Sequence, residues 1–240
     1  MASPDEARVH EDGSIIPDIL AHNLELAATI VLAIAAVLTA WTAFQSSKWG
    51  GVQAISFSEA GANRTESTRF STLAGQHAQV DISTFTNWLN AVQADARAGD
   101  IELPSSAADY QPDPETLSGF LFVRFRDEFK PAVDAWLRTA PFTDPNAPPS
   151  PLDVPEYELA ARDAAEELQA GADQASQRAR DANRTSDDYV VSAVLAALVL
   201  FFAGVSSKLI RPRNRVLVLL LAVAVLIGTA IRVFSLPIEI

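Results

Sequence analysis

The chain contains no cysteine among its 240 residues and only three histidines. The absence of cysteine excludes a disulfide framework, a zinc or iron–sulfur site ligated by cysteine, and catalysis by a thiol. With so few histidines, a histidine-rich metal site is nearly excluded as well. Basic residues are also scarce, with 18 Lys and Arg against 30 Asp and Glu and a formal net charge of −12. This balance argues against a nucleic-acid partner, because neutralising phosphates needs clustered Lys and Arg.

Recognisable catalytic motifs are missing too. The sequence has no glycine-rich phosphate loop, no HExxH pair, no GxSxG elbow and no set of kinase motifs. No pair of nucleophile and base, and no set of metal ligands, can be assembled from the spacing of its residues. We therefore expect a non-enzymatic protein without a cofactor.

Three long apolar runs are the clearest positive feature of the sequence. They cover residues 24–44, 189–207 and 216–234. A helix needs about 20 apolar residues to cross the hydrocarbon core of a bilayer, so each run predicts a transmembrane helix rather than a buried helix of a soluble core. The first run follows residues 1–23, which are acidic, and it is longer than the apolar part of a signal peptide, about 7–15 residues. We therefore expect an uncleaved anchor.

The turn between the second and third runs predicts the orientation. Residues 208–215 contain basic side chains and no acid. These side chains belong to Lys208, Arg211, Arg213 and Arg215. Under the positive-inside rule this turn is cytoplasmic, and so is the acidic N-terminal segment. Residues 45–188 and the tail 235–240 are then expected outside the cytoplasm.

Residues 45–188 show no alternating strand pattern, so we expect a helical extracytoplasmic domain and an all-α protein. Asp81 is placed to cap a helix that would end at Gly99. Asp113 is placed to cap a second helix, and Pro131 would kink that helix or force it to restart.

A proline-rich segment, residues 140–155, precedes one long helix. Its prolines predict an extended or turn-rich strap laid across the other helices. No proline occurs in residues 156–209, and small and apolar residues recur there at spacings of three and four. The alanines of this seam are Ala161, Ala164, Ala172, Ala175, Ala179, Ala182, Ala193, Ala196 and Ala203. The pattern predicts a single helix that continues into the second span and packs closely against another helix along this seam.

Two pairs of ionisable side chains have the spacing of a functional site. Glu25 with His22 could ring the cytoplasmic mouth of a pore in an oligomer and select cations, but we favour an acid at the lipid headgroups. His77 and Asp81 are four residues apart and could share a helix face, which suits a metal or a proton relay. Two groups are too few ligands for a metal, so we favour a histidine satisfied by neighbouring side chains.

Three stretches carry a familiar pattern. They are WTAFQSSKWGG (residues 41–51), DISTFTNWL (residues 81–89) and RFRDEFKPAVDAWLRTAPFTDPNAPPSPLDVPEYELA (residues 124–160). Together they resemble a family of bacterial inner-membrane proteins with one span, a helical outer domain and a closing hairpin of two spans. The resemblance covers most of the chain after residue 24. It implies a topology and a bacterial origin, and it implies no activity and no site residue.

Two functions agree with these features. The first is a homo-oligomeric membrane protein that acts as an assembly scaffold or as a channel for ions or small solutes, because small-residue faces allow tight packing between subunits. The second is a membrane-anchored accessory module that binds an extracytoplasmic protein partner through its acidic helical domain. In both, membrane lipids surround the three spans.

Overall fold

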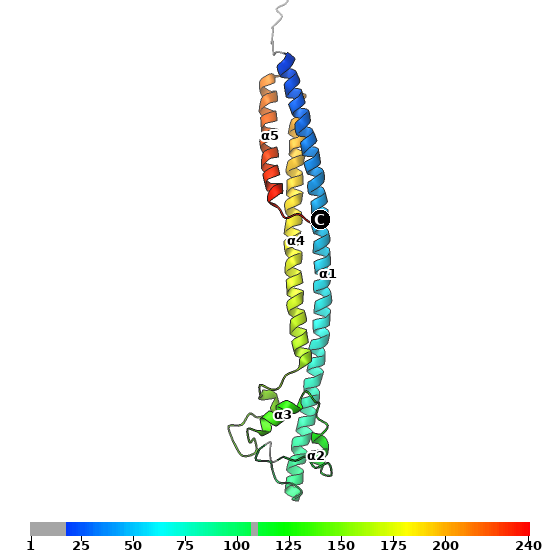
Figure 1. Cartoon of the computed structure of the whole chain (residues 1–240), viewed down its shortest axis with the longest axis vertical. Coiled ribbons are helices and arrows are strands. Elements are labelled where there is room, and N and C mark those ends of the chain that lie inside the picture. The colour runs from blue at the N-terminus through cyan, green and yellow to red at the C-terminus, as the bar shows by residue number, and fades with distance from the viewer. Residues whose placement is uncertain (1–17, 107–109) are drawn as a thin grey trace, which may run out of the picture. The chain divides into compact units, whose positions relative to one another are not determined.

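The computed structural model describes residues 18–106 and 110–240, with side chains described from residue 22 onward. Its elements are α1 (Asp18–Ala98), α2 (Leu117–Phe122), α3 (Lys130–Leu137), the 3₁₀ helix η1 (Pro151–Asp153), α4 (Ala160–Ser206) and α5 (Pro212–Ser235) (Figure 1). No strand occurs in the described residues, which confirms the all-α expectation. The acidic segment expected at residues 1–23 lies largely outside them.

α1 is a single helix of 81 residues. The sequence contains no proline between Pro17 and Pro104, so no residue within the helix lacks a hydrogen-bond donor. The expectation that Asp81 caps a new helix is therefore wrong, because Asp81 lies in the interior of α1. The expected end is confirmed: Gly99 follows the last helical residue with a φ of 84°, a left-handed conformation that glycine adopts without strain.

Three of the helices are long and apolar enough to cross a membrane. They are α1, α4 and α5, which contain the three apolar runs of the sequence. α4 continues without interruption through Tyr189, as the proline-free stretch predicts. α5 begins at Pro212 rather than at residue 216, so the turn is shorter than expected. Proline fits this position because the first helical residues have no intrahelical hydrogen bond to lose.

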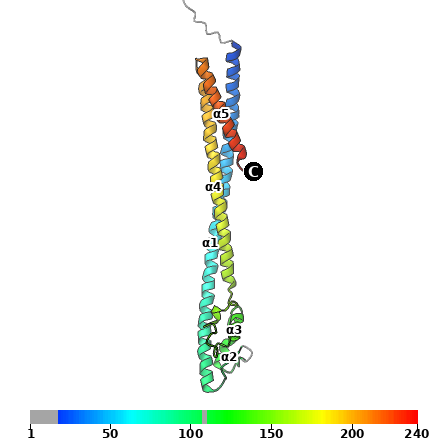
Figure 2. The same ribbon diagram turned by 90° about the vertical axis from the view of Figure 1, so that its left-hand side faces the viewer.

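The chain divides into two units, and in the first, Met1–Phe57 with Gln177–Ile240, α5 lies beside α1 and α4 (Figures 1 and 2). Its core consists of small and aliphatic side chains from all three helices. The buried members are Ala28, Val31, Ala35, Val199, Ala203, Leu219, Ala222 and Leu226. Alanine on each helix lets the backbones approach closely. This packing gives the bundle an apolar core cluster.

The second unit, Ser58–Ser176, has an aromatic core. Trp88 is fully buried at its centre. The ring centroids of Tyr110, Phe122 and Phe125 lie 5.6, 5.8 and 5.8 Å from that of Trp88. The indole Nε1 of Trp88 donates a hydrogen bond to the Tyr110 hydroxyl at 3.0 Å, which satisfies the one polar atom of the buried ring.

The start of α2 differs from the expectation. Asp113 is not its cap, because its Oδ1 accepts the N–H of Glu115, two residues on, in a turn. Thr116 is the N-cap, and its Oγ1 accepts the N–H of Gly119. Pro131 lies in the first turn of α3, so the chain restarts a helix there, as the sequence predicts.

The proline-rich strap leads into α4. The indole Nε1 of Trp136 donates to the carbonyl of Pro148 at 2.7 Å, and Val154 is buried in the aromatic core. α4 begins at Ala160, four residues after the proline-free stretch starts. The carbonyl of Leu159 accepts the N–H of Arg162 at 2.7 Å and so closes the first turn.

Candidate functional site

The most enclosed charged group of the second unit is Asp81, which is fully buried on α1. Arg126 binds it with two hydrogen bonds, from Nε to Oδ1 at 3.0 Å and from Nη2 to Oδ2 at 2.8 Å. This fork-to-fork geometry is the strongest arrangement available to a guanidinium and a carboxylate. The buried charge of Asp81 is thereby compensated by a residue 45 positions away in the sequence.

Arg126 also contacts Glu128, whose Oε2 accepts from Nη1 at 2.7 Å. The other oxygen of Glu128, Oε1, accepts the N–H of Ala160, the first residue of α4, at 2.7 Å. A carboxylate at this end of a helix satisfies a free donor and complements the helix dipole. The hydrogen bond from Arg126, followed by that from Ala160, lowers the pKa of Glu128 below its ordinary value.

His77 and Tyr157 complete the cluster. Nδ1 of His77 lies 3.3 Å from Nη1 of Arg126 and 3.9 Å from Oε2 of Glu128. The Tyr157 hydroxyl donates to Oδ2 of Asp81 at 3.3 Å. Burial and the neighbouring Asp81 charge raise the pKa of Tyr157 to about 12. We call these five residues, His77, Asp81, Arg126, Glu128 and Tyr157, the Arg126 cluster.

The Arg126 cluster joins α1 to the segment that precedes α4. The position between His77 and Asp81, where a metal or a relayed proton was an alternative, is filled by the guanidinium of Arg126. Among the described residues, no group of three or more His, Asp or Glu side chains could ligate a metal ion. The contacts of His77 therefore fit the interpretation of a satisfied histidine.

A second polar cluster fixes the tail in the first unit. The amide of Gln45 is fully buried, and it pairs with the backbone of Glu239 in both directions, donating from Nε2 at 3.1 Å and accepting at Oε1 at 3.0 Å. Trp49 Nε1 and the Tyr189 hydroxyl both donate to the carbonyl of Pro237 at 3.1 Å. We call this set of contacts the tail clasp.

An ion pair accompanies the tail clasp. Nη2 of Arg232, in the last turn of α5, lies 2.6 Å from Oδ1 of Asp188 on α4. Both side chains are partly exposed. The sequence places Arg232 near the end of an apolar run, and its partner explains how a charge is accommodated at that position.

The small-residue seam of α4 is covered by the same chain. Six of its alanines are at most 2% exposed: Ala172, Ala175, Ala179, Ala182, Ala196 and Ala203. Ala161 is buried as well, while Ala164 and Ala193 are half-buried. In the second unit, the Ser67 hydroxyl of α1 donates to the carbonyl of Ala165 at 2.7 Å. Close backbone approach is what the small side chains permit.

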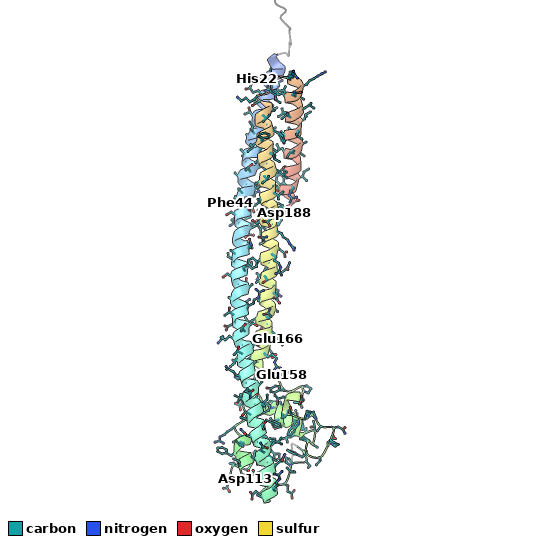
Figure 3. All side chains as sticks on the ribbon, turned by 180° about the vertical axis from the view of Figure 1, so that it is seen from behind. His22, Phe44, Asp113, Glu158, Glu166 and Asp188 are labelled. Carbon is teal, nitrogen blue, oxygen red and sulfur yellow. The ribbon has the colours of Figure 1, made fainter. Side chains whose placement is uncertain are left out.

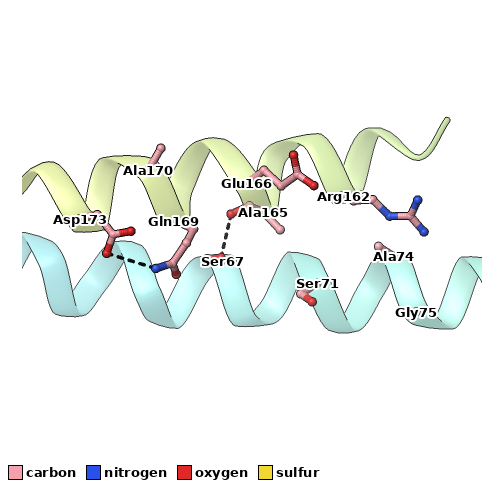
Figure 4. A pocket seen from close by; sticks show the side chains of 10 residues that line it. All are labelled: Ser67, Ser71, Ala74, Gly75, Arg162, Ala165, Glu166, Gln169, Ala170 and Asp173. Atoms are coloured by element: carbon pink, nitrogen blue, oxygen red, sulfur yellow. Dashed lines mark hydrogen bonds between the residues drawn. The ribbon is translucent and has the colours of Figure 1, made fainter.

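Along the same pair of helices an open hollow of 640 Å³ is visible (Figure 4). It is lined by Ser67, Ser71, Ala74, Gly75, Arg162, Ala165, Glu166, Gln169, Ala170 and Asp173. Figure 4 shows two hydrogen bonds among the lining residues, from Ser67 to the carbonyl of Ala165 and from Gln169 to Asp173. Its charged side chains are exposed, so we assign it no ligand.

The remaining sequence-derived candidates lie at the surface of the first unit. His22 is exposed on the first turns of α1 (Figure 3), and Glu25 is exposed as well. Neither side chain has an ion-pair partner within residues 22–106 and 110–240. Lys208, Arg211 and Arg213 are exposed beside the start of α5, and Arg215 is half-buried.

No protein-family model, no curated protein and no solved structure matches this chain. Sequence reasoning identified the spacing of His77 and Asp81, but it missed Arg126, Glu128 and Tyr157. The only local signal for Arg126 and Glu128 is the charged run RFRDEFK, and Tyr157 has none, because the partners lie far away along the chain. Gln45 was missed for the same reason.

Proposed function

We propose that the protein is a three-span protein of a bacterial inner membrane, and that residues 45–188 lie outside the cytoplasm and bind a protein partner. Three long apolar helices support the membrane assignment. The basic turn before α5 supports a cytoplasmic α4–α5 connection, and hence the orientation. In this proposal the spans anchor a helical module and perform no chemistry.

The seam of α4 favours a partner over self-assembly. Its alanines were the main reason to expect contacts between subunits, and their faces are already covered within one chain. The core cluster of the three-helix bundle is apolar, and the buried hydroxyls of Thr42, Ser192 and Thr229 donate to carbonyls of their own helices. A water-filled path within one subunit therefore has no support from these residues. If subunits of this protein associate, they must do so through a surface other than the α4 seam.

The observation that carries the proposal is the charge and exposed apolar surface of the second unit. Residues 58–176 contain eight Lys and Arg and 20 Asp and Glu, so this unit accounts for the whole net charge of −12. On α2 and its C-cap, Leu117, Phe120 and Val123 are 57%, 43% and 48% exposed at a spacing of three. A basic protein surface with an apolar contact would complement both features.

Photocrosslinking tests the proposal in cells that produce the full chain. A photoreactive phenylalanine analogue is placed at Phe120 and, as a control, at the exposed Asp144 of the strap. We expect an adduct with a different protein at Phe120 only. Its yield should fall in about 1 M salt, because salt screens the attraction between charges. The double substitution Leu117→Ser with Val123→Ser should abolish it. No adduct at Phe120, or equal adducts at both positions, overturns the proposal.

A homo-oligomeric scaffold or channel is the second candidate. It is favoured by an apolar groove of 720 Å³ between α1 and α5, which a helix of another copy could fill. The groove is lined by Ala33, Ile34, Val37, Leu38, Trp41, Leu226, Ile227, Ala230, Val233 and Phe234. Coexpression of two differently tagged copies separates the candidates: copurification of both tags supports the oligomer, and a monomeric mass in native membrane discs rejects it. If a channel forms, Glu25→Gln changes its cation preference.

A further inference from the structure

The basic turn before α5 is the one strongly cationic place in an acidic chain. Lys208, Arg211, Arg213 and Arg215 fall within eight consecutive residues that contain no acid. Within residues 22–106 and 110–240, none of these four side chains has an ion-pair partner. Four like charges in a short turn repel one another unless an anion neutralises them.

The start of α5 adds donors to these charges. Arg211 is the N-cap residue, and its side chain makes no capping hydrogen bond. The first turn contains no acidic residue, so nothing within the helix complements its positive end. The backbone N–H groups at such a helix start are suited to bind a phosphate.

A buried donor lies next to these groups. Nε of Arg215 is buried and has no hydrogen-bond partner among the described residues. Nε of Arg232 is in the same state, but that side chain is paired with Asp188 through Nη2. Leaving a charged donor buried and unpaired is unfavourable. Arg215 therefore needs an acceptor that the described residues do not supply.

An apolar crevice lies beside these groups. It has a volume of 470 Å³ and is lined by Leu24 of α1 together with Pro212, Arg213, Val216 and Leu217 of α5. Four of the five lining side chains are carbon only, and the fifth is a cation. A free phosphate would use the cations and leave the crevice empty, whereas a phospholipid would occupy both.

We propose that the turn and the start of α5 form a binding site for an anionic phospholipid. The phosphate diester is bound by Arg211, Arg213 and Arg215, and an acyl chain enters the crevice beside Leu24 and Leu217. Arginine suits this role because its planar fork donates two parallel hydrogen bonds to phosphate oxygens. The inference rests on the proposed insertion of α1, α4 and α5 in a bilayer, and it identifies which lipid the cytoplasmic side prefers.

The test uses the full chain purified in detergent and given phosphatidylglycerol or phosphatidylcholine. Native mass spectrometry measures how much of each lipid remains bound. We expect phosphatidylglycerol to be retained at least about fivefold better, and Arg211→Gln with Arg213→Gln to remove most of this preference. Both side chains are exposed, so folding is not at stake. Arg180→Gln with Arg184→Gln on α4 removes the same charge and leaves the preference unchanged.

Three outcomes overturn the site: no preference between the two lipids, an equal loss in the α4 control, or full displacement of the lipid by inorganic phosphate, which would show binding of a free anion. Alkaline carbonate extraction of cell membranes distinguishes failure of the site from failure of the proposed function. A chain that resists extraction but shows no lipid preference contradicts only the lipid site. A chain that is released by carbonate contradicts membrane insertion and the site together.

Discussion

Arg126 connects more of the second unit than any of its neighbours along the chain. It compensates the buried charge of Asp81, contacts His77 and orients the carboxylate of Glu128 that caps α4. A buried ion pair contributes little net stability by its presence, but removal of one partner leaves the other charge buried and alone. Arg126 therefore links α1 to the segment that precedes α4 and, through Glu128, to the first residue of α4.

Replacement of this residue should destabilise the protein strongly. We expect Arg126→Leu to lower the free energy of unfolding by about 3–5 kcal/mol, because Asp81 then remains buried without a counter-charge. Denaturant unfolding followed by tryptophan fluorescence measures the change. Arg69→Leu is the control, since Arg69 pairs with Glu66 at the exposed surface, and it should have no measurable effect. Equal effects of the two variants would contradict the role of Arg126.

Acid should weaken the contact between Glu128 and α4. The pKa of Glu128 in the folded protein is below its ordinary 4.5, because Arg126 and the N–H of Ala160 bind the carboxylate. Its stabilising contribution is therefore present above pH 4.5 and is lost as the pH falls further, through the lowered folded-state pKa. We expect Glu128→Gln to be less stable than the natural protein at neutral pH and to lose less stability on acidification. Parallel unfolding curves at each pH would measure this, and identical acid profiles would refute it.

The sequence predicted the role of a single residue only where that role depends on the residue itself or on its neighbours along the chain. Gly99 was identified as a helix end because its conformational freedom is a property of the residue itself. Asp81 was misassigned as a cap because an aspartate in a polar stretch has the same local signature whether it caps a helix or binds an arginine. Its partners lie 45 and 76 positions away, and no spacing rule relates residues at that separation.

At the scale of elements, the length of α4 was more predictable than its register, whereas the continuity of α1 through Asp81 was not predicted. Proline-free stretches and apolar runs indicate where helices continue. The seam was expected at Ala193, but the buried position there is Ser192. Beyond Tyr189, α4 packs against α5 as well as α1, so its buried face turns toward two neighbours. The residue pattern of one helix does not predict which of its faces will pack against a second neighbouring helix.

Close packing along the seam can be tested with a bulky side chain. Ala175 of α4 is fully buried, so Ala175→Leu must displace side chains or backbone of α1. We expect a loss of about 1–3 kcal/mol in the free energy of unfolding. Ala170→Leu places the same side chain on the exposed face of α4 and should change stability little. A tolerated Ala175→Leu would show that the two helices are not in tight contact.

At the scale of the whole molecule, the absence of cysteine makes the orientation directly measurable. Single cysteines can be introduced at Asp113 of the acidic unit and at Ile210 of the basic turn, which is 97% exposed, with no background labelling. We expect a membrane-impermeant maleimide to label Asp113→Cys in intact bacteria with a permeable outer layer. Ile210→Cys should react only after the inner membrane is opened. The reverse pattern would contradict the proposed topology.

The pairing of Gln45 with Glu239 has a consequence for biosynthesis. The two residues are 194 positions apart, so the amide of Gln45 leaves the ribosome long before its partner exists. A chain cut before residue 237 would leave the amide of Gln45 and the indole N–H of Trp49 without these partners, so that water would have to satisfy them. The tail clasp therefore forms only after synthesis has passed residue 239, and it is among the last contacts that the first helix makes.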